Sequence, residues 1–227
     1  MALQTDLKPV PRPALSIERV LGVAIGLADE GGLDSLTMRK LAKELGVEVM
    51  SLYYYVSKKD DVLDGILDLV VQEMEPASAG PDWKAAIRAT SISAHHVLER
   101  HPWACGLMMA PARVRRARMR YMDSMLGRIR EAGFSAEQTD LAYHALDSHI
   151  IGSTLWEAGY SAGTVAAAGT AEAAREFGAA FLRALPDGEF PYLAEHVEQH
   201  LGIPAAGETS FEFGLDLILD GLERILG

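Results

Sequence analysis

The chain has 227 residues, of which 49% are hydrophobic, and a formal net charge of −11 at pH 7. This hydrophobic content is typical of a globular protein and excludes a disordered one, and no run of about 18 apolar residues suggests a membrane span. The first residues lack the basic and apolar regions of a secretory signal. The single cysteine, Cys105, excludes an internal disulfide and is typical of a cytoplasmic protein.

Acidic residues are concentrated after residue 59. Residues 1–59 hold 8 Lys and Arg against 7 Asp and Glu, a net charge of +1, whereas the remainder holds 13 against 25, a net charge of −12. The acidic total therefore does not exclude a nucleic-acid partner for the N-terminal part, because the distribution of charge matters more than its sum. We expect few phosphate contacts and a modest non-specific affinity for DNA.

The first 14 residues carry Pro9, Pro11 and Pro13, which are incompatible with a helix. We expect residues 1–14 to form a flexible arm. A contact with the minor groove of DNA through its few cations is the alternative.

Two short helices joined by a glycine turn follow. Thr37 can cap the first, and Gly46 permits the left-handed backbone of a tight turn. The second, residues 49–56, has Leu52 and Val56 one turn apart, so some of its three consecutive tyrosines must face outward. Two helices arranged in this way, with an exposed aromatic and polar face on the second, are typical of a helix-turn-helix.

The helices on either side complete a DNA-binding domain, residues 15–75. The first begins at Ser16 and ends at Gly31–Gly32. The last begins at Ser57, which would form a capping-box-like pair with Asp60. A break in composition at residues 76–81, PASAGP, sets the predicted domain boundary.

The segments LTMRKLAKELGV, SLYYYV and SKKDDVLDGIL resemble the DNA-binding domain of the TetR (tetracycline-repressor) family of bacterial transcription regulators. The resemblance covers residues 16–74 almost without gaps. It implies phosphate contacts for Tyr53, Tyr55 and Lys59, and base contacts for Val49, Met50 and Tyr54. The predicted DNA-binding residues are Thr37, Arg39, Glu48, Val49, Met50, Ser51, Tyr53, Tyr54, Tyr55, Lys58 and Lys59.

The operator sequence cannot be inferred from these side chains. Val49 and Met50 can contact thymine methyl groups but offer no hydrogen bonds to bases. Direct readout is therefore expected to depend on Arg39 and on the shape of the DNA.

The rest of the chain, residues 82–227, shows helical patterns and no strand pattern. We expect the small-residue stretch 159–170 to be a mobile loop. The predicted fold is all-α, with an N-terminal three-helix helix-turn-helix head and a C-terminal helical ligand-binding and dimerisation domain. Its helices are predicted at residues 83–100, 111–132, 135–157, 171–185, 192–201 and 208–226.

Two of these helices carry stripes suited to a partner helix. The segment FEFGLDLILDGLERIL resembles, more loosely, the C-terminal helix of the TetR-like regulators nearest to the tetracycline repressor. The resemblance implies a four-helix dimer interface, and packing within one chain is the alternative. The predicted interface residues are Ala145, Ser148 and Gly152 on one helix and Phe211, Leu215, Ile218, Leu222 and Ile225 on the other.

Methionine and aromatic side chains in the C-terminal half are typical of an adaptable apolar pocket. Ordinary core packing is the alternative for each of them, and it is the family resemblance that favours a cavity. The predicted ligand-binding residues are Trp103, Met108, Met109, Met122, Tyr143, His149, Trp156, Phe177 and Phe181.

Two other patterns are interpreted as structural. Arginines between positions 113 and 130 flank an apolar helical stripe and are expected to form its solvated face. The histidines show no Cys/His or His-x-x-x-His pair at ligand spacing, so neither a metal nor a cofactor is predicted.

Together these patterns predict a cytoplasmic, ligand-responsive transcriptional repressor. It would bind a palindromic double-stranded operator as a homodimer, without a membrane partner, and a small, largely hydrophobic effector would release it. One alternative is an effector-free DNA-binding dimer. The other is a small α-helical enzyme acting on an apolar substrate, for which no acid–base pair or cofactor loop is present in the sequence.

Overall fold

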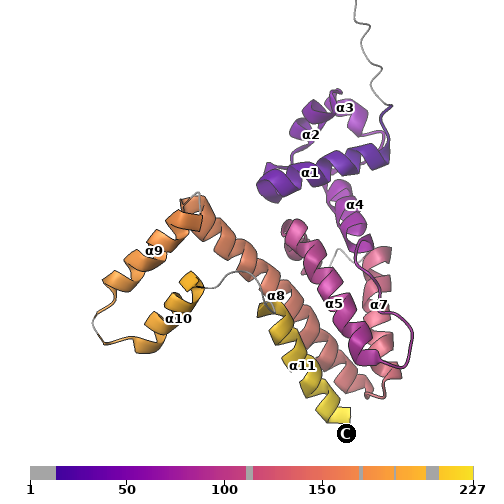
Figure 1. Ribbon diagram of the computed structural model, residues 1–227. Coiled ribbons are helices and arrows are strands. Elements are labelled where there is room, and N and C mark those ends of the chain that lie inside the picture. The colour runs from indigo at the N-terminus through magenta and orange to yellow at the C-terminus, as the bar shows by residue number, and fades with distance from the viewer. Residues whose placement is uncertain (1–13, 111–114, 169–170, 187, 203–209, 227) are drawn as a thin grey trace, which may run out of the picture. The chain divides into compact units, whose positions relative to one another are not determined.

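The computed structural model describes residues 14–110, 115–168, 171–186, 188–202 and 210–226. Every regular element in these ranges is a helix, which confirms the all-α prediction (Figure 1). None of the described helices is both long enough and apolar enough to cross a bilayer. The predicted N-terminal arm lies outside the described residues, except for Ala14.

Contacts between Cα atoms divide the chain into two compact units, residues 1–66 and 67–227. The first unit contains α1 (Ile17–Ser35), α2 (Met38–Leu45), α3 (Val49–Leu52) and the beginning of α4 (Lys59–Gln72). The second contains the end of α4, α5 (Trp83–Arg100), α6 (Trp103–Met108), α7 (Arg116–Glu131), α8 (Ala136–Ala168), α9 (Ala171–Ala184), α10 (Pro191–Gly202) and α11 (Ser210–Leu226).

Side-chain caps begin the helices of the first unit where the sequence predicts them. The Ser16 hydroxyl accepts a hydrogen bond from the Arg19 amide at 3.3 Å, and the Thr37 hydroxyl accepts one from the Lys40 amide at 3.1 Å. Gly46 ends α2 in the left-handed conformation, with φ of 69°. These caps satisfy amides that would otherwise lack partners at a helix start.

The core of the first unit comes from one face of each helix. Apolar side chains at helical spacing pack together there, and the aromatic side chains that follow α3 stay outside. Gly32, with φ of 68°, interrupts the helical backbone near the end of α1, close to the predicted stop. The buried side chains include Val20, Leu21, Ala24, Leu27, Leu41, Ala42, Leu45, Leu52, Val56, Val62 and Ile66.

The start of α4 uses a different carboxylate from the one predicted. Asp61 accepts hydrogen bonds from the amides of Ser57 and Lys58, at 2.8 and 3.1 Å. Asp60 lies 3.8 Å from the Lys58 ammonium instead. Because α4 begins at Lys59, the third helical residue, from which a side chain reaches back to the cap, is Asp61.

The boundary between the units falls inside α4, before the stretch of residues 76–81 that the sequence suggested. The end of α4 is held within the second unit, where the Asp68 carboxylate accepts a hydrogen bond from the Ala117 amide at 3.0 Å. Just beyond α4, the Glu75 amide donates to the Ser93 hydroxyl at 2.9 Å. These bonds attach the end of this helix to α7 and α5.

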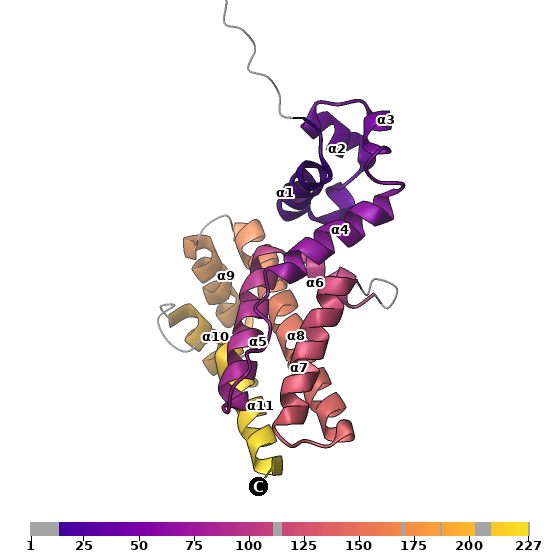
Figure 2. The same cartoon turned by 90° about the vertical axis from the view of Figure 1, so that its right-hand side faces the viewer.

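In the second unit, α8 packs against α5, α7 and α11 (Figures 1 and 2). Buried apolar residues from all four helices fill the space between them, and Phe134 in the turn before α8 adds a fully buried ring. The buried side chains of this core include Ile87, Leu98, Met125, Ile129, Phe134, Leu146, Ile150, Phe211, Leu215 and Leu219.

Ion pairs attach α11 to α5 along its outer edge. Arg88 donates from Nε to Asp216 at 2.7 Å and from Nη2 to Glu212 at 2.9 Å. One turn earlier, Lys84 contacts Asp220 at 2.6 Å and Glu223 at 2.7 Å. Acidic residues on α11 therefore face basic residues on α5 at matching intervals.

The prediction of a loop at residues 159–170 is wrong up to residue 168, because α8 continues to Ala168. This segment contains several alanines, and each glycine costs a helix only about 1 kcal/mol. Beyond it, α9 packs against α8 and α10 against α9. The predicted start of a helix at Pro111 lies outside the described residues, and α7 is described from Arg116.

Candidate functional site

The helix-turn-helix of the first unit presents one face of α3 and its following turn to solvent. Leu52 and Val56 point into the core, whereas the side chains of Met50 and Tyr54 are 71% and 89% exposed. Tyr53 is also exposed, and Val49 is half-buried. A large apolar side chain and aromatic rings with polar tips are therefore available to a DNA groove.

Two of the predicted phosphate contacts also have partners within the first unit. The hydroxyl of Tyr55 donates to the carbonyl of Leu15 at 2.8 Å, so its single hydrogen is already used. The ammonium of Lys59 lies 3.5 Å from the carbonyl of Leu33 and keeps further donors for a phosphate.

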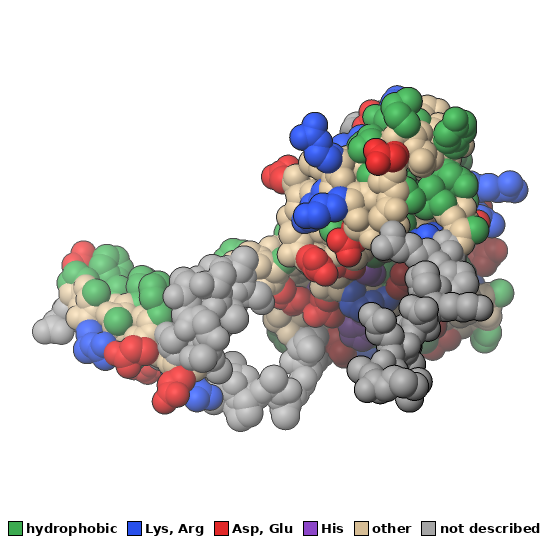
Figure 3. All heavy atoms as spheres, turned by 90° about the horizontal axis from the view of Figure 1, so that it is seen from above, with side chains coloured by type: hydrophobic (Ala, Val, Ile, Leu, Met, Phe, Trp, Pro, Cys, Tyr) green, Lys and Arg blue, Asp and Glu red, His purple; other side chains and the backbone are tan. Residues whose placement is uncertain are grey.

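The remaining predicted DNA-binding residues surround α3. Glu48 and Lys58 are exposed, and Ser51 is half-buried. Thr37 and Arg39 are exposed at the start of α2. The view from above, which includes the α2 and α3 face, shows hydrophobic side chains close to Lys and Arg side chains (Figure 3). This combination is suited to contact both bases and phosphates.

Two of the predicted ligand-binding residues line one pocket. His149 and Trp156 line a pocket of about 360 Å³ together with Ser148, Gly152, Ser153, Glu157 and Ser210. Met108 and Tyr143 are buried, and Trp103 and Met122 are half-buried. Met109, Phe177 and Phe181 are exposed in the single chain. The pocket thus contains His149 and Trp156 of the predicted set, and a ligand-binding role for the other residues stays a prediction.

A polar group that the sequence analysis missed lies around Tyr143. Burial raises the pKa of the Asp147 carboxyl, and the Arg118 guanidinium partly offsets that rise. Burial and the neighbouring Asp147 raise the pKa of Tyr143. The Arg118 atoms Nε and Nη1 are buried and have no hydrogen-bond partner in the described part of the chain. The spacing of Tyr143 and Asp147, one helical turn apart, was the available signal.

For three of its five residues, the structure corrects the expected partner-facing stripe on α11. Phe211, Leu215 and Leu222 are buried within one chain, where α11 packs against α5 and α8. Phe211 stacks between two imidazole rings, with centroids 3.8 Å from His95 and 5.0 Å from His149. A four-three repeat cannot distinguish a helix in the same chain from one in a partner, so both alternatives were open.

Close packing at this contact depends on Gly214. The His149 Nε2 lies 2.9 Å from the Phe211 carbonyl, and a Cβ atom built on Gly214 would lie 2.5 Å from the Cε1 of that imidazole. Real Cβ atoms do not approach other atoms so closely, so a side chain at position 214 would force the His149 imidazole or α11 to shift. Gly214 therefore allows α11 to approach α8 of the same chain closely.

A different face of α11 is exposed. Phe213, Leu217 and Ile225 lie on it, and Ile218 is half-buried. On α8, the predicted interface residues Ala145, Ser148 and Gly152 are all exposed, as are Leu141 and Leu155.

Both units match known families. Residues 20–66 match the bacterial regulatory proteins of the tetR family, and residues 75–226 match the tetracyclin repressor-like C-terminal domain. The transcriptional repressor DrrR1 of Streptomyces coeruleorubidus is 33% identical over 222 residues, which span 95% of this chain and 80% of DrrR1. The class A tetracycline repressor of Escherichia coli is 29% identical over 90% of this chain and 89% of its own length.

A solved structure agrees with these sequence matches. The Streptomyces coelicolor protein ActR, in complex with actinorhodin, superposes with a TM-score of 0.74 at 25% identity, over 95% of this chain and 100% of ActR. The matched families and relatives are transcription regulators and not enzymes, so the enzyme alternative is excluded. The chain thus belongs to the tetR family of bacterial regulatory proteins and is a DNA-binding transcriptional repressor.

Proposed function

We propose that this repressor is a cytoplasmic homodimer that binds a palindromic operator and leaves it when a small, largely hydrophobic effector binds the C-terminal unit. The observation that carries the effector proposal is the buried guanidinium of Arg118, whose Nε and Nη1 lack an acceptor among the described residues. Leaving such a group unpaired costs about 1–3 kcal/mol, or more for a charged group. An effector with an acceptor group would remove that cost.

The surroundings of Arg118 indicate the chemistry of the effector. Tyr143 and Asp147 provide an aromatic ring and polar groups near it. An aromatic molecule with a carbonyl, phenolate or carboxylate oxygen fits such a mixed environment. The similar ActR has been solved with actinorhodin bound, so actinorhodin and tetracycline are the first molecules to test.

The exposed faces of α8 and α11 support the homodimer. Leu141 and Leu155 on α8, and Phe213 and Leu217 on α11, would leave contact with water on pairing with a second copy. The small exposed residues of α8 would let another helix approach closely. Two such helices from each chain would form a bundle.

A homodimer in turn implies that the operator is palindromic. Two symmetry-related α3 helices that enter successive major grooves must lie about 34–36 Å apart, and they contact two half-sites related by a two-fold axis. An effector that changes this separation weakens DNA binding. By linkage, bound operator must then weaken effector binding by the same factor.

The test measures fluorescence anisotropy of labelled DNA from the region flanking the repressor gene, with and without actinorhodin or tetracycline. We expect release of the DNA by at least one of them, and loss of that response in Arg118→Met with effector-free affinity unchanged. Arg120→Met, which replaces an exposed arginine of α7, is the matched control. DNA binding that no tested small molecule alters, in wild type and variants alike, would favour the effector-free dimer.

A further inference from the structure

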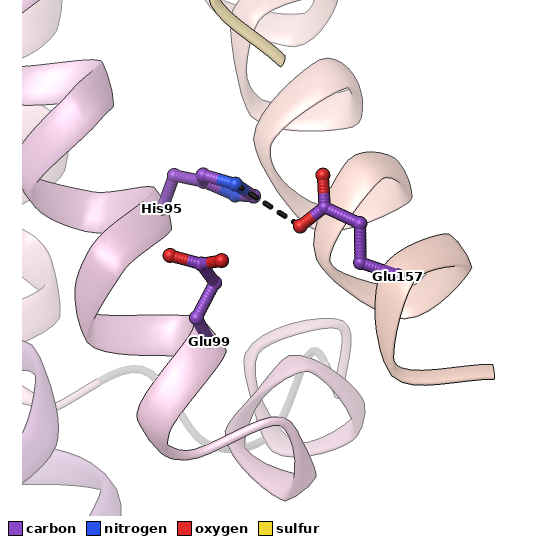
Figure 4. Close-up of side chains that lie close together, drawn as sticks. All are labelled: His95, Glu99 and Glu157. Atoms are coloured by element: carbon purple, nitrogen blue, oxygen red, sulfur yellow. Dashed lines mark ion pairs between the residues drawn. The ribbon is translucent and has the colours of Figure 1, made fainter. Parts of the chain in front are cut away.

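Three potential metal ligands meet between α5 and α8. His95 and Glu99 lie one turn apart on α5, and Glu157 faces them from α8 (Figure 4). One ligand atom from each residue lies within 4.8 Å of the other two. His95 is buried, Glu157 is half-buried and Glu99 is exposed, so the cluster has a closed side and an open side.

The hydrogen bonds of Thr154 determine which nitrogen of His95 is available. The Thr154 hydroxyl donates its only hydrogen to the Ile150 carbonyl at 2.9 Å. It can therefore only accept from the His95 Nδ1, which lies 3.1 Å away. In this arrangement the Nδ1 carries the ring proton, and in a neutral imidazole the Nε2 then presents a lone pair.

That lone pair points at a carboxylate. The His95 Nε2 and the Glu157 Oε2 are 3.2 Å apart, and Glu99 adds a second carboxylate to the same space. Two lone pairs at this distance repel each other unless a proton or a cation lies between them. A single proton could join one pair of these atoms, but it would leave the third residue without a partner.

We propose that His95 Nε2, Glu99 and Glu157 bind a divalent transition-metal cation, with Zn²⁺ as the best fit. One imidazole nitrogen and two carboxylate oxygens suit Zn²⁺, whereas Mg²⁺ prefers oxygen ligands alone. Tetrahedral bonds of about 2.0–2.1 Å separate neighbouring ligand atoms by roughly 3.3 Å. The Nε2 to Oε2 distance of 3.2 Å already agrees with that spacing.

The residues behind the cluster support this assignment. A metal-binding histidine usually donates its other ring N–H to an acceptor that fixes its orientation, and Thr154 is placed to accept this hydrogen bond. Phe211 stacks on the His95 ring with planes 12° apart and limits its rotation. The open side next to Glu99 leaves a position for water. The bound cation would link α5 to α8, and its binding does not depend on the proposed effector.

The test is calorimetric titration of chelator-treated, full-length protein with Zn²⁺ and, separately, with Mg²⁺ at pH 7.5. We expect one saturable Zn²⁺ site per chain and no comparable response to Mg²⁺. Glu157→Gln and Glu99→Gln keep the side-chain shape but remove the charge, and each should weaken Zn²⁺ binding by about tenfold or more. Far-UV circular dichroism confirms that both variants are folded.

His144→Gln is the matched control. It removes a histidine that lies 3.5 Å from Asp140 on the exposed face of α8, and it should leave the site unchanged. Substitution with Co²⁺ provides a second readout, a visible absorption band that is lost in Glu157→Gln. Absence of saturable Zn²⁺ binding would show that a proton alone joins His95 to Glu157 and would overturn the proposal. Zn²⁺ binding unaffected by either glutamine variant would overturn it as well.

Discussion

The hydroxyl of Tyr55 donates a hydrogen bond of 2.8 Å to the carbonyl of Leu15, 40 residues earlier in the chain. This bond ties the turn that follows α3 to the residue before the cap of α1. Family resemblance places Tyr55 at a phosphate, but a hydroxyl has one hydrogen, and here it is donated to Leu15. We infer that Tyr55 positions the recognition segment, whereas the exposed Tyr53 remains available to DNA.

The first prediction separates these two roles. Tyr55→Phe should lower the free energy of unfolding by about 1 kcal/mol, the usual net contribution of one hydrogen bond. Tyr53→Phe should change it by less than about 0.5 kcal/mol, because that ring is exposed. Urea denaturation of both variants measures the difference. Equal stabilities would contradict the positioning role of Tyr55.

The second prediction concerns phosphate contacts. Lys59→Ala should weaken binding to operator and unrelated DNA alike and reduce the slope of log affinity against log salt by about one unit. Anisotropy titrations between about 50 and 200 mM salt, the range over which such slopes are measured, would show the reduced slope. Arg175→Ala, an exposed cation on α9, is the control and should leave the slope unchanged.

The third prediction tests the dimer surface. Leu217 is 55% exposed in the single chain, whereas Leu222 is 9% exposed. Leu217→Glu should give a folded monomer, since a charge would be buried only on pairing. Leu222→Glu should destabilise the chain itself, by several kcal/mol. Analytical ultracentrifugation and circular dichroism distinguish these results. If the Leu217→Glu variant still forms a normal dimer, the interface lies elsewhere on the chain.

The fourth prediction concerns Trp156, which lines the pocket of about 360 Å³ and is 76% exposed. Trp156→Ala should leave operator affinity without effector within about threefold, because coupling of about 1–3 kcal/mol acts only when effector is bound. If the effector binds in this pocket, the effector concentration needed to release the DNA should shift about tenfold. An unchanged concentration would show that the effector binds elsewhere. Loss of DNA binding without effector would show that Trp156 is structural.

The fifth prediction concerns Cys105. Burial raises the pKa of its thiol to about 11, whereas an unperturbed thiol titrates near 8.5. At pH 8 native Cys105 should therefore react with iodoacetamide at least about 100-fold more slowly than the unfolded chain, because the thiolate is the nucleophile. Rapid labelling of native protein would contradict its burial.

The same pKa difference affects stability. The native state holds the thiol proton more tightly than the unfolded chain, so this contribution is complete below about pH 8.5 and is lost as the pH rises toward 11. Cys105→Ala lacks the titrating group. Its unfolding free energy should therefore fall less between pH 8 and 10 than that of the wild type.

The local elements of the first unit could be predicted because their signals are local. Ser16, Thr37 and Gly46 cap or end helices through bonds to residues a few positions away. The exposed face of α3 could also be predicted, since Leu52 and Val56 are apolar and lie one turn apart. Such features depend on spacing along one helix.

The second unit was predicted less well because its functional groups come from different helices. His95 and Glu99 are one turn apart, but nothing in the sequence places Glu157, 62 positions further on from His95, against them. The stripe of Phe211, Leu215 and Leu222 was equally compatible with a helix of the same chain and with a partner. Spacing identifies an apolar face, whereas only tertiary contacts identify what covers it.

The close contact between Gly214 and His149 predicts where mutations that abolish repression should occur. A codon change that adds any side chain there would place a carbon atom against the imidazole of His149, so either that imidazole would leave the Phe211 carbonyl or α11 would move away from α8. In a reporter screen for loss of repression, substitutions at position 214 should therefore recur, although this residue belongs to neither the helix-turn-helix nor the region around Arg118. Compensating mutations should appear at His149, where a smaller side chain would restore the space.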